Sequence, residues 1–112
     1  MAPQPSSDSS ETSTAIALLP DGQRIALAPG VPVELGRQSS HPQVRDALLH
    51  HDVVSRRHAV VTLNGAVLTI RHLGTTNPTF ANDQQVTHES RVPLPVRIRL
   101  GETVAIEITK GT

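Results

Sequence analysis

The chain has 112 residues, with ten basic and ten acidic side chains and therefore no formal net charge, which disfavours a surface dedicated to nucleic acid. It contains no cysteine, so neither disulfides nor thiolate metal sites can form. Phe80 is the only Phe, Trp or Tyr, which argues against stacking on nucleic-acid bases and leaves the core to Val, Ile, Leu and Ala.

The first 13 residues differ in composition from the rest of the chain. After Met1 they carry no large apolar side chain, so they cannot bury enough surface to offset the entropy of ordering. We therefore predict a disordered tail over residues 1–13 and one domain over residues 14–112. The tail lacks the basic start and apolar stretch of a signal peptide, and no apolar run approaches the roughly 20 residues that span a bilayer. We expect a cytoplasmic protein (nuclear if eukaryotic) that is not secreted and does not contact membranes.

The first half of the domain predicts short strands separated by turn residues. The expected strands cover residues 15–19, 24–28 and 33–35, with turns at Pro20-Asp21-Gly22 and Pro29-Gly30. Residues 38–46 are polar and contain Pro42, so we predict a loop there, followed by a possible short strand over 47–49. A helix over 44–51 is locally possible, but it lacks a clear apolar face.

The second half predicts two hairpins. Residues 58–63 and 66–72 flank Asn64-Gly65, the strongest short signal for a type I′ turn, and residues 96–100 and 104–108 flank Gly101-Glu102. Residues 74–85 have loop composition. Short strands with turns every 8–12 residues favour an all-β fold, a two-sheet sandwich or a barrel.

Three polar clusters interrupt the strand pattern. Gly36-Arg37 ends one predicted strand, Ser55-Arg56-Arg57-His58 precedes another, and residues 75–79 (Thr-Thr-Asn-Pro-Thr) follow a third. Together they offer guanidinium groups, hydroxyls and an amide, which are the donors that a phosphate dianion prefers. Each cluster alone is ordinary turn chemistry, but their order and spacing as a set indicate a binding site.

These clusters resemble the motifs of the forkhead-associated (FHA) domain. Gly36-Arg37 and the Ser-x-x-His motif Ser55–His58 match its first two motifs. Residues 73–83 match, in register, its Leu-x-Ser-x-Asn-Gly-Thr-x-Val-Asn-Gly loop, and a similar late turn follows at residues 100–104. The resemblance implies an all-β sandwich of two sheets and about eleven strands, with binding loops at one end. The last strand would be missing or merged into residues 104–109.

The resemblance also implies a function, the binding of protein segments that contain phosphothreonine. The phosphopeptide-binding residues would be Arg37, Ser55, Arg56, Thr76 and Asn77. Arg37 and Ser55 would bind the phosphate, Arg56 would add a second positive contact, and Asn77 would hold the peptide main chain. Gly36 and His58 would support the site structurally, while Arg57 would be exposed and without a role. We expect the loss of Arg37 to abolish binding with little effect on folding.

The partners would then be proteins in which a Ser/Thr kinase has phosphorylated a threonine. For this chain we expect no cofactor, no bound metal, no direct contact with nucleic acid and no catalysis. Two residues depart from the family pattern: Pro78 stands for Gly after Asn77, and Asp83 stands for the final Gly. Proline has no N–H and pushes the preceding residue towards extended dihedrals. Thr12 lies among hydroxyls and acids in the tail, so its phosphorylation could mediate self-association with a second copy.

Other functions fit the same residues less well. Ser55 and His58 suggest a hydrolase, but no nucleophile elbow or orienting acid accompanies them. The histidines at 50, 51, 58 and 72 suggest a metal site, but they lack ligand spacing. A phosphate-independent FHA-like scaffold is the main alternative, because folds persist without their ligand residues.

Overall fold

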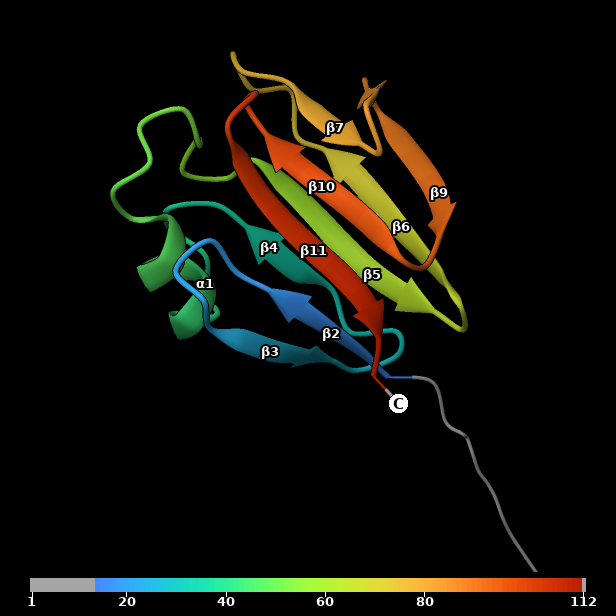
Figure 1. Ribbon diagram of the computed structural model, residues 1–112. Helices are drawn as coiled ribbons and strands as arrows, with labels where there is room; N and C mark the ends of the chain where they lie inside the picture. Colours follow the sequence, from blue (N-terminus) through green and yellow to red (C-terminus); the bar gives the residue numbers. More distant parts are fainter. Residues whose placement is uncertain (1–13, 112) are drawn as a thin grey trace, which may run out of the picture.

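The computed structural model describes residues 14–111, so the predicted tail over 1–13 lies outside the described residues. Within that range, ten strands form two antiparallel sheets, and one short helix lies in the connection between β4 and β5 (Figure 1). The six-stranded sheet has the order β3 (Arg24–Leu27), β2 (Ala15–Leu18), β11 (Val104–Lys110), β10 (Val96–Leu100), β7 (Thr79–Ala81), β8 (Gln84–Val86). The four-stranded sheet has the order β4 (Val33–Leu35), β5 (Ala59–Asn64), β6 (Val67–His72), β9 (Glu89–Pro93). The predicted all-β sandwich is confirmed.

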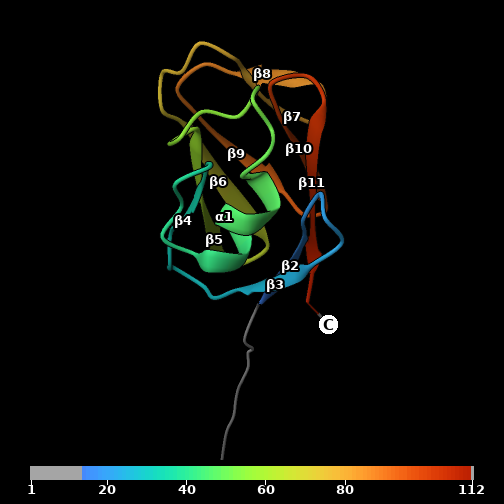
Figure 2. The same ribbon diagram turned by 90° about the vertical axis from the view of Figure 1, so that its left-hand side faces the viewer.

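The two sheets lie face to face and enclose one aliphatic core, as the edge-on view of Figure 2 shows. Every second side chain of β5 and β11 is buried, for example Val61 and Leu63 on β5 and Ile106 and Ile108 on β11. This alternation follows from the two-residue period of a strand. Phe80 does not enter the core. It is half-buried on the outer face of β7, with the guanidinium carbon of Arg99 4.6 Å from its ring centroid.

Both predicted hairpins form. β5 and β6 pair from Asn64↔Val67 to Ala59↔His72, so the two turn residues are Gly65 and Ala66. Gly65 has a φ of 64° and Ala66 has no positive φ, which fits a type II′ turn, so the predicted type I′ turn at Asn64-Gly65 was wrong in position and type. β10 and β11 pair from Leu100↔Val104 to Val96↔Ile108. β11 continues to Lys110, and its last four residues also pair with β2. The last strand of the chain is therefore present as β11, which lies between β10 and β2 in the six-stranded sheet.

The prediction for residues 38–49 was wrong. Instead of a loop and a short strand, helix α1 covers Pro42–Leu48. Pro42 occupies the first turn, where its missing N–H is not needed, and Val44, Ala47 and Leu48 are buried. These three positions form the apolar stripe of a helix, but seven residues are too few for a clear period in the sequence.

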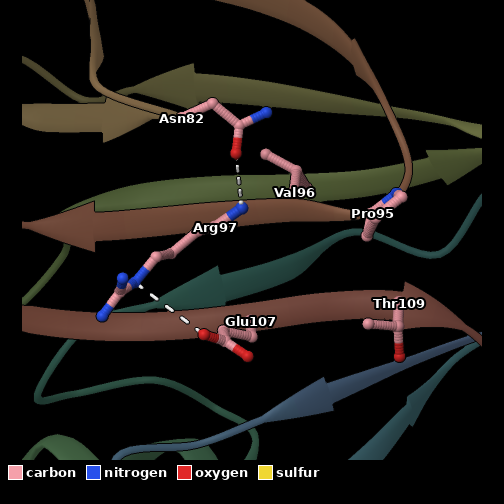
Figure 3. A pocket seen from close by; sticks show the side chains of 6 residues that line it. All are labelled: Asn82, Pro95, Val96, Arg97, Glu107 and Thr109. Carbon is pink, nitrogen blue, oxygen red and sulfur yellow. Dashed lines mark hydrogen bonds and ion pairs between the residues drawn. The ribbon is translucent and has the colours of Figure 1, made fainter.

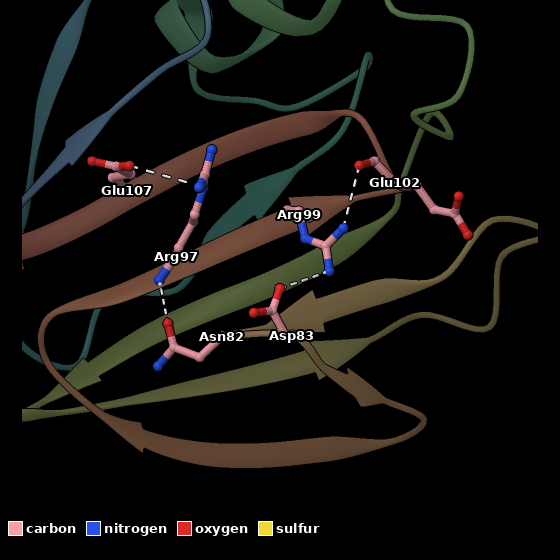
Figure 4. A network of polar contacts seen from close by, with 6 residues as sticks. All are labelled: Asn82, Asp83, Arg97, Arg99, Glu102 and Glu107. Carbon is pink, nitrogen blue, oxygen red and sulfur yellow. Dashed lines mark hydrogen bonds and ion pairs between the residues drawn. The ribbon is translucent and has the colours of Figure 1, made fainter.

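The prediction of a loop over 74–85 was also wrong in part, because β7 and β8 form a short hairpin there. Its turn residues Asn82 and Asp83 have φ values of 48° and 72°, which is the geometry of a type I′ turn. Asn82 accepts a hydrogen bond from the Arg97 N–H (3.0 Å, Figure 3), and Asp83 pairs with Arg99 (3.0 Å, Figure 4). Asp83 thus takes the conformation that favours glycine.

Strand β9 was not predicted. It lies at the edge of its sheet and pairs only with β6, and none of its five residues is fully buried. Such a strand has no alternation of apolar and polar residues to reveal it.

The connections that carry the three polar clusters meet at one end of the sandwich. We call these the apical loops: residues 36–41, 49–58, 73–78 and 101–103. At the opposite end, the Gly111 N–H donates to the Thr14 carbonyl (2.9 Å), so the start of β2 lies beside the end of β11. No helix among residues 14–111 is long and apolar enough to cross a membrane.

Candidate functional site

The first two polar clusters, Gly36-Arg37 and Ser55–His58, lie side by side and are joined by backbone hydrogen bonds. Arg37 N–H donates to the Ser55 carbonyl (3.1 Å), and Gln38 N–H donates to the Arg56 carbonyl (3.0 Å). This crossing of the two segments is close because Gly36 is buried without a side chain: a Cβ there would lie 2.8 Å from the Arg56 carbonyl carbon. Gly36 therefore lets the backbone carrying Arg37 lie against the backbone carrying Ser55 and Arg56.

The side chain of Arg37 is anchored on one edge. Its Nε donates to the Val54 carbonyl at 2.6 Å, and the residue is half-buried. The two terminal nitrogens make no hydrogen bond to any part of the described chain. Because a guanidinium presents five N–H donors in a planar fork, this arrangement fixes the plane of the group and leaves its outer edge free.

Asn77 is anchored in the same way on the neighbouring carbonyl. Its Nδ2 donates to the Val53 carbonyl at 2.9 Å, while Thr75 Oγ1 donates to the Asn77 carbonyl at 2.7 Å. Because the Val53 carbonyl accepts only, the amide nitrogen must face it, and Oδ1 is left as an acceptor. Gly101 packs against Val53, where an added Cβ would meet the Val53 side chain at 3.1 Å. The carbonyls of Val53 and Val54 thus position both polar side chains.

His58 links two apical loops from inside the fold. The Ser55 N–H donates to its Nδ1 (3.0 Å), and its Nε2 lies 3.1 Å from the Pro78 carbonyl oxygen. Since a carbonyl only accepts, Nε2 carries the proton and Nδ1 does not, so both contacts require the neutral ring. Burial lowers the pKa of His58 below the ordinary 6.5, opposed by the Pro78 contact and assisted by His72 nearby. The geometry and the direction of the shift agree.

This shift predicts a pH dependence of stability. Because the folded pKa of His58 is depressed, the unfolded chain binds its proton more readily, and stability is lost as pH falls below about 6.5. We expect His58→Gln to be less stable than wild type at pH 7.5 but to show a flatter dependence between about pH 7 and pH 5.5. Urea unfolding at each pH measures this. If the free energy of unfolding changed with pH equally in the two proteins, His58 would not be the group responsible.

Comparison with known proteins identifies the fold family. The family model of the FHA domain matches residues 33–104. The chain belongs to the FHA domain family. It is similar to the FHA domain-containing protein FhaB of Mycobacterium tuberculosis, with 37% identity over 87 residues, which are 78% of this chain and 52% of that protein. The chain thus spans about half the length of the curated relatives it matches.

Solved FHA structures have the same architecture. One, from a structural and functional study of phosphothreonine-dependent FHA domain interactions, is 30% identical, with a TM-score of 0.65, covering 88% of this chain and 96% of the other. The FhaA FHA domain complexed with the intracellular domain of Rv3910 is 28% identical, with a TM-score of 0.62, covering 87% and 99%.

The FHA fold brings the sequence-predicted residues to one end. Arg37 and Ser55 lie on the crossing of the first two loops, and Asn77 reaches the same segment through Val53. Arg56 and Thr76 are exposed, and no side-chain hydrogen bond engages them within residues 14–111. Arg57 was expected to be exposed, and its side chain is 71% exposed with its Nε paired to Glu34 at 2.9 Å.

Pro78 contributes its carbonyl to the support of the apical loops. Its carbonyl accepts from His58 Nε2 and from the Gly101 N–H (2.8 Å), and neither contact needs a proline N–H. The carbonyls of Val53 and Val54, which anchor Asn77 and Arg37, were not predicted from the sequence. No sequence signal identifies them, because any residue type provides a backbone carbonyl.

Two of the four histidines considered as a metal site, His58 and His72, make other contacts. His58 and His72 meet edge to face with centroids 5.9 Å apart, and His72 Nδ1 lies 2.9 Å from Thr79 Oγ1. In the part of the chain that the structure describes, no group of three or more His, Cys, Asp or Glu side chains is placed to hold a metal ion.

Proposed function

We propose that this FHA domain binds protein segments containing phosphothreonine at its apical loops and has no catalytic activity or cofactor of its own. The observation that carries this proposal is Arg37, whose Nε is held by Val54 while its outer N–H donors are free beside Ser55. A guanidinium oriented in advance binds a phosphate with little further loss of side-chain entropy. The Ser55 hydroxyl and the exposed Arg56 supply the further donors that a group with nearly two negative charges requires.

Asn77 would bind the main chain of the peptide. One hydrogen of its Nδ2 is donated to the Val53 carbonyl, which leaves the second N–H and the Oδ1 acceptor. The Oδ1 acceptor suits a peptide N–H. Thr76, exposed next to it, would donate its hydroxyl or N–H to the phosphate. The peptide would therefore cross between the loop that carries Ser55 and the loop that carries Asn77.

The relatives support the same function. One solved FHA structure concerns phosphothreonine-dependent FHA domain interactions, and another FHA domain is complexed with the intracellular domain of a different protein. Partners of this chain would accordingly be phosphoproteins produced by a Ser/Thr kinase. The bacterial FhaB relatives favour the cytoplasm as the place where kinase, partner and this domain meet.

Binding should depend on phosphate. A phosphothreonine peptide selected from a degenerate array should bind with a Kd on the order of micromolar, as expected for a flexible peptide that must be ordered. The affinity should fall as salt rises, because charged contacts at an exposed rim are screened. Isothermal titration calorimetry with the phosphorylated and dephosphorylated peptide tests this. Equal affinities would favour the phosphate-independent scaffold instead.

We propose that the chain's own tail supplies a further ligand, with phosphorylated Thr12 binding the apical loops of a second copy. Binding to its own site is out of reach. Thr12 is two residues, at most about 7 Å, from Thr14, which lies beside Gly111 at the far end of the sandwich. The seven residues of β11 separate that end from the apical loops, roughly 20 Å at about 3.3 Å per residue.

Self-association through the tail should therefore require phosphorylation of one copy and an intact site on another. Protein phosphorylated at Thr12 should elute as a larger species than unphosphorylated protein in size-exclusion chromatography, and Thr12→Ala treated with the same kinase should not. An unshifted peak for the phosphorylated protein at high concentration would reject the proposal.

A further inference from the structure

Strand β2 places apolar side chains on the outer face of the six-stranded sheet, where polar side chains are usual. Its small residues Ala15 and Ala17 point into the core and are 0% and 2% exposed, while Ile16 and Leu18 point outward, Leu18 with 37% exposure. A strand with one solvated face normally places polar residues on that face. Apolar side chains on both faces are typical of a strand that is covered on both sides. β2 thus has the composition of a covered strand but no covering element within residues 14–111.

Charged residues flank this aliphatic strand on both neighbours. Leu18 is the direct cross-strand partner of Arg24 on β3 and of Glu107 on β11, so all three side chains share the outer face. With Ile16 and Thr109 they line a shallow hollow of about 330 Å³. Arg24 forms no ion pair inside the described range, and Glu107 has only a loose contact with Arg97 (3.9 Å, Figure 3).

We propose that this face binds the same face of a second copy. The row Arg24–Leu18–Glu107 is complementary in charge to itself. A two-fold axis that lies between the two copies and runs parallel to β2 places Leu18 opposite Leu18 and Ile16 opposite Ile16. It also places the β3 of each copy opposite the β11 of the other. Arg24 of each copy then faces Glu107 of the other, so the interface contains an aliphatic centre and two identical ion pairs.

The proposed packing agrees with how sheets stack. Two sheets that pack face to face lie about 10 Å apart with their strands within roughly 30° of each other, which an axis parallel to β2 permits. The paired surface covers mainly three strands, so it is smaller than the roughly 800 Å² per partner of a stable complex. The dimer should accordingly be weak and dependent on concentration.

The symmetry has a consequence for function, which rests on the proposed phosphothreonine binding. Rotation about an axis parallel to the strands keeps the strand direction, so the apical loops of both copies point the same way. The dimer would present two phosphothreonine sites side by side, and it would favour partners phosphorylated at two positions through the higher effective concentration of the second site.

The experiment measures self-association of the full chain, unphosphorylated and without any peptide, by sedimentation equilibrium. Wild type should show a monomer–dimer equilibrium with a Kd between about 10 μM and 1 mM. Leu18→Glu should be monomeric throughout. Arg24→Glu and Glu107→Arg should each raise the dimer Kd about tenfold or more, because each change removes both ion pairs and adds like-charge contacts. The charge-swapped double variant, Arg24→Glu with Glu107→Arg, should return the Kd to near the wild-type value.

The restoration by the double variant separates this interface from general damage to the sheet. Arg91→Glu, a change on the other sheet at an exposed position, is the matched control and should dimerise like wild type. A wild-type protein that stays monomeric at about 1 mM, the weak end of the expected range, would overturn the proposal. So would a charge-swapped variant that dimerises no better than the single variants. Neither result depends on phosphate binding, which is measured separately with peptide.

Discussion

Arg37→Ala should lose measurable affinity for a phosphothreonine peptide. Removing one partner of a hydrogen-bonded charge pair typically costs about 2–5 kcal/mol, and at about 1.4 kcal/mol per tenfold change this takes a micromolar ligand beyond easy detection. The structure adds an effect on folding that the sequence did not indicate. Because Arg37 Nε donates to the Val54 carbonyl, the variant should also lose about 1–2 kcal/mol of unfolding free energy.

Arg37→Lys distinguishes the two roles of this side chain. A lysine keeps the charge but cannot bind Val54 with one nitrogen and the phosphate with two others. It should therefore bind far more weakly than wild type, by tenfold or more. Arg57→Ala is the matched control, because Arg57 pairs with Glu34 on the β4 strand and is 71% exposed. Calorimetry and thermal melting of the three variants measure both effects. An Arg37→Ala protein that binds normally would remove Arg37 from the site.

The parts of the fold that the sequence predicted are those with local signals. Asn64-Gly65 is a strong hairpin signal, and the flanking strands alternate in burial. The β5–β6 hairpin was therefore predicted, although its turn lies one residue later, at Gly65-Ala66. The signal at Gly101 likewise predicted the hairpin of β10 and β11. In contrast, β9 is fully buried on neither face, and α1 has only Val44, Ala47 and Leu48 to mark its apolar face. Both elements exist because of tertiary packing, which a single sequence does not display.

The candidate site likewise contains one part that the sequence predicted and one part that it did not. The side chains that would meet a ligand, such as Arg37, Ser55 and Asn77, were proposed from the resemblance to the FHA motifs. What holds them was not predicted, because it consists of backbone carbonyls at residues 53, 54 and 78 and of contacts between loops far apart in the chain. A motif identifies functional groups by residue type, whereas a carbonyl has no residue type. Predictions of the stability of site variants therefore needed the structure.

Gly36→Ala should cause the largest loss of stability among single-methyl changes at the apical loops. The added Cβ would overlap the Arg56 carbonyl oxygen and lie 2.8 Å from its carbon. Both are backbone atoms, which cannot move aside by changing a rotamer. Accommodating the methyl group requires the segments 36–38 and 55–57 to separate, which breaks the Arg37–Ser55 and Gln38–Arg56 backbone hydrogen bonds. Overpacking of this kind costs about 1–3 kcal/mol, and the lost hydrogen bonds add to it.

The same separation should weaken phosphopeptide binding, because Arg37 and Ser55 would no longer lie side by side. Gly65→Ala is the matched control. It adds the same methyl group to a glycine at a φ of 64° with no atom within 4 Å, at the opposite end of the sheet. It should lose about 1 kcal/mol from backbone strain and keep wild-type peptide affinity. Thermal unfolding and peptide titration of both variants decide the matter. If Gly36→Ala resembles Gly65→Ala in both measurements, the close crossing at Gly36 does not position the site.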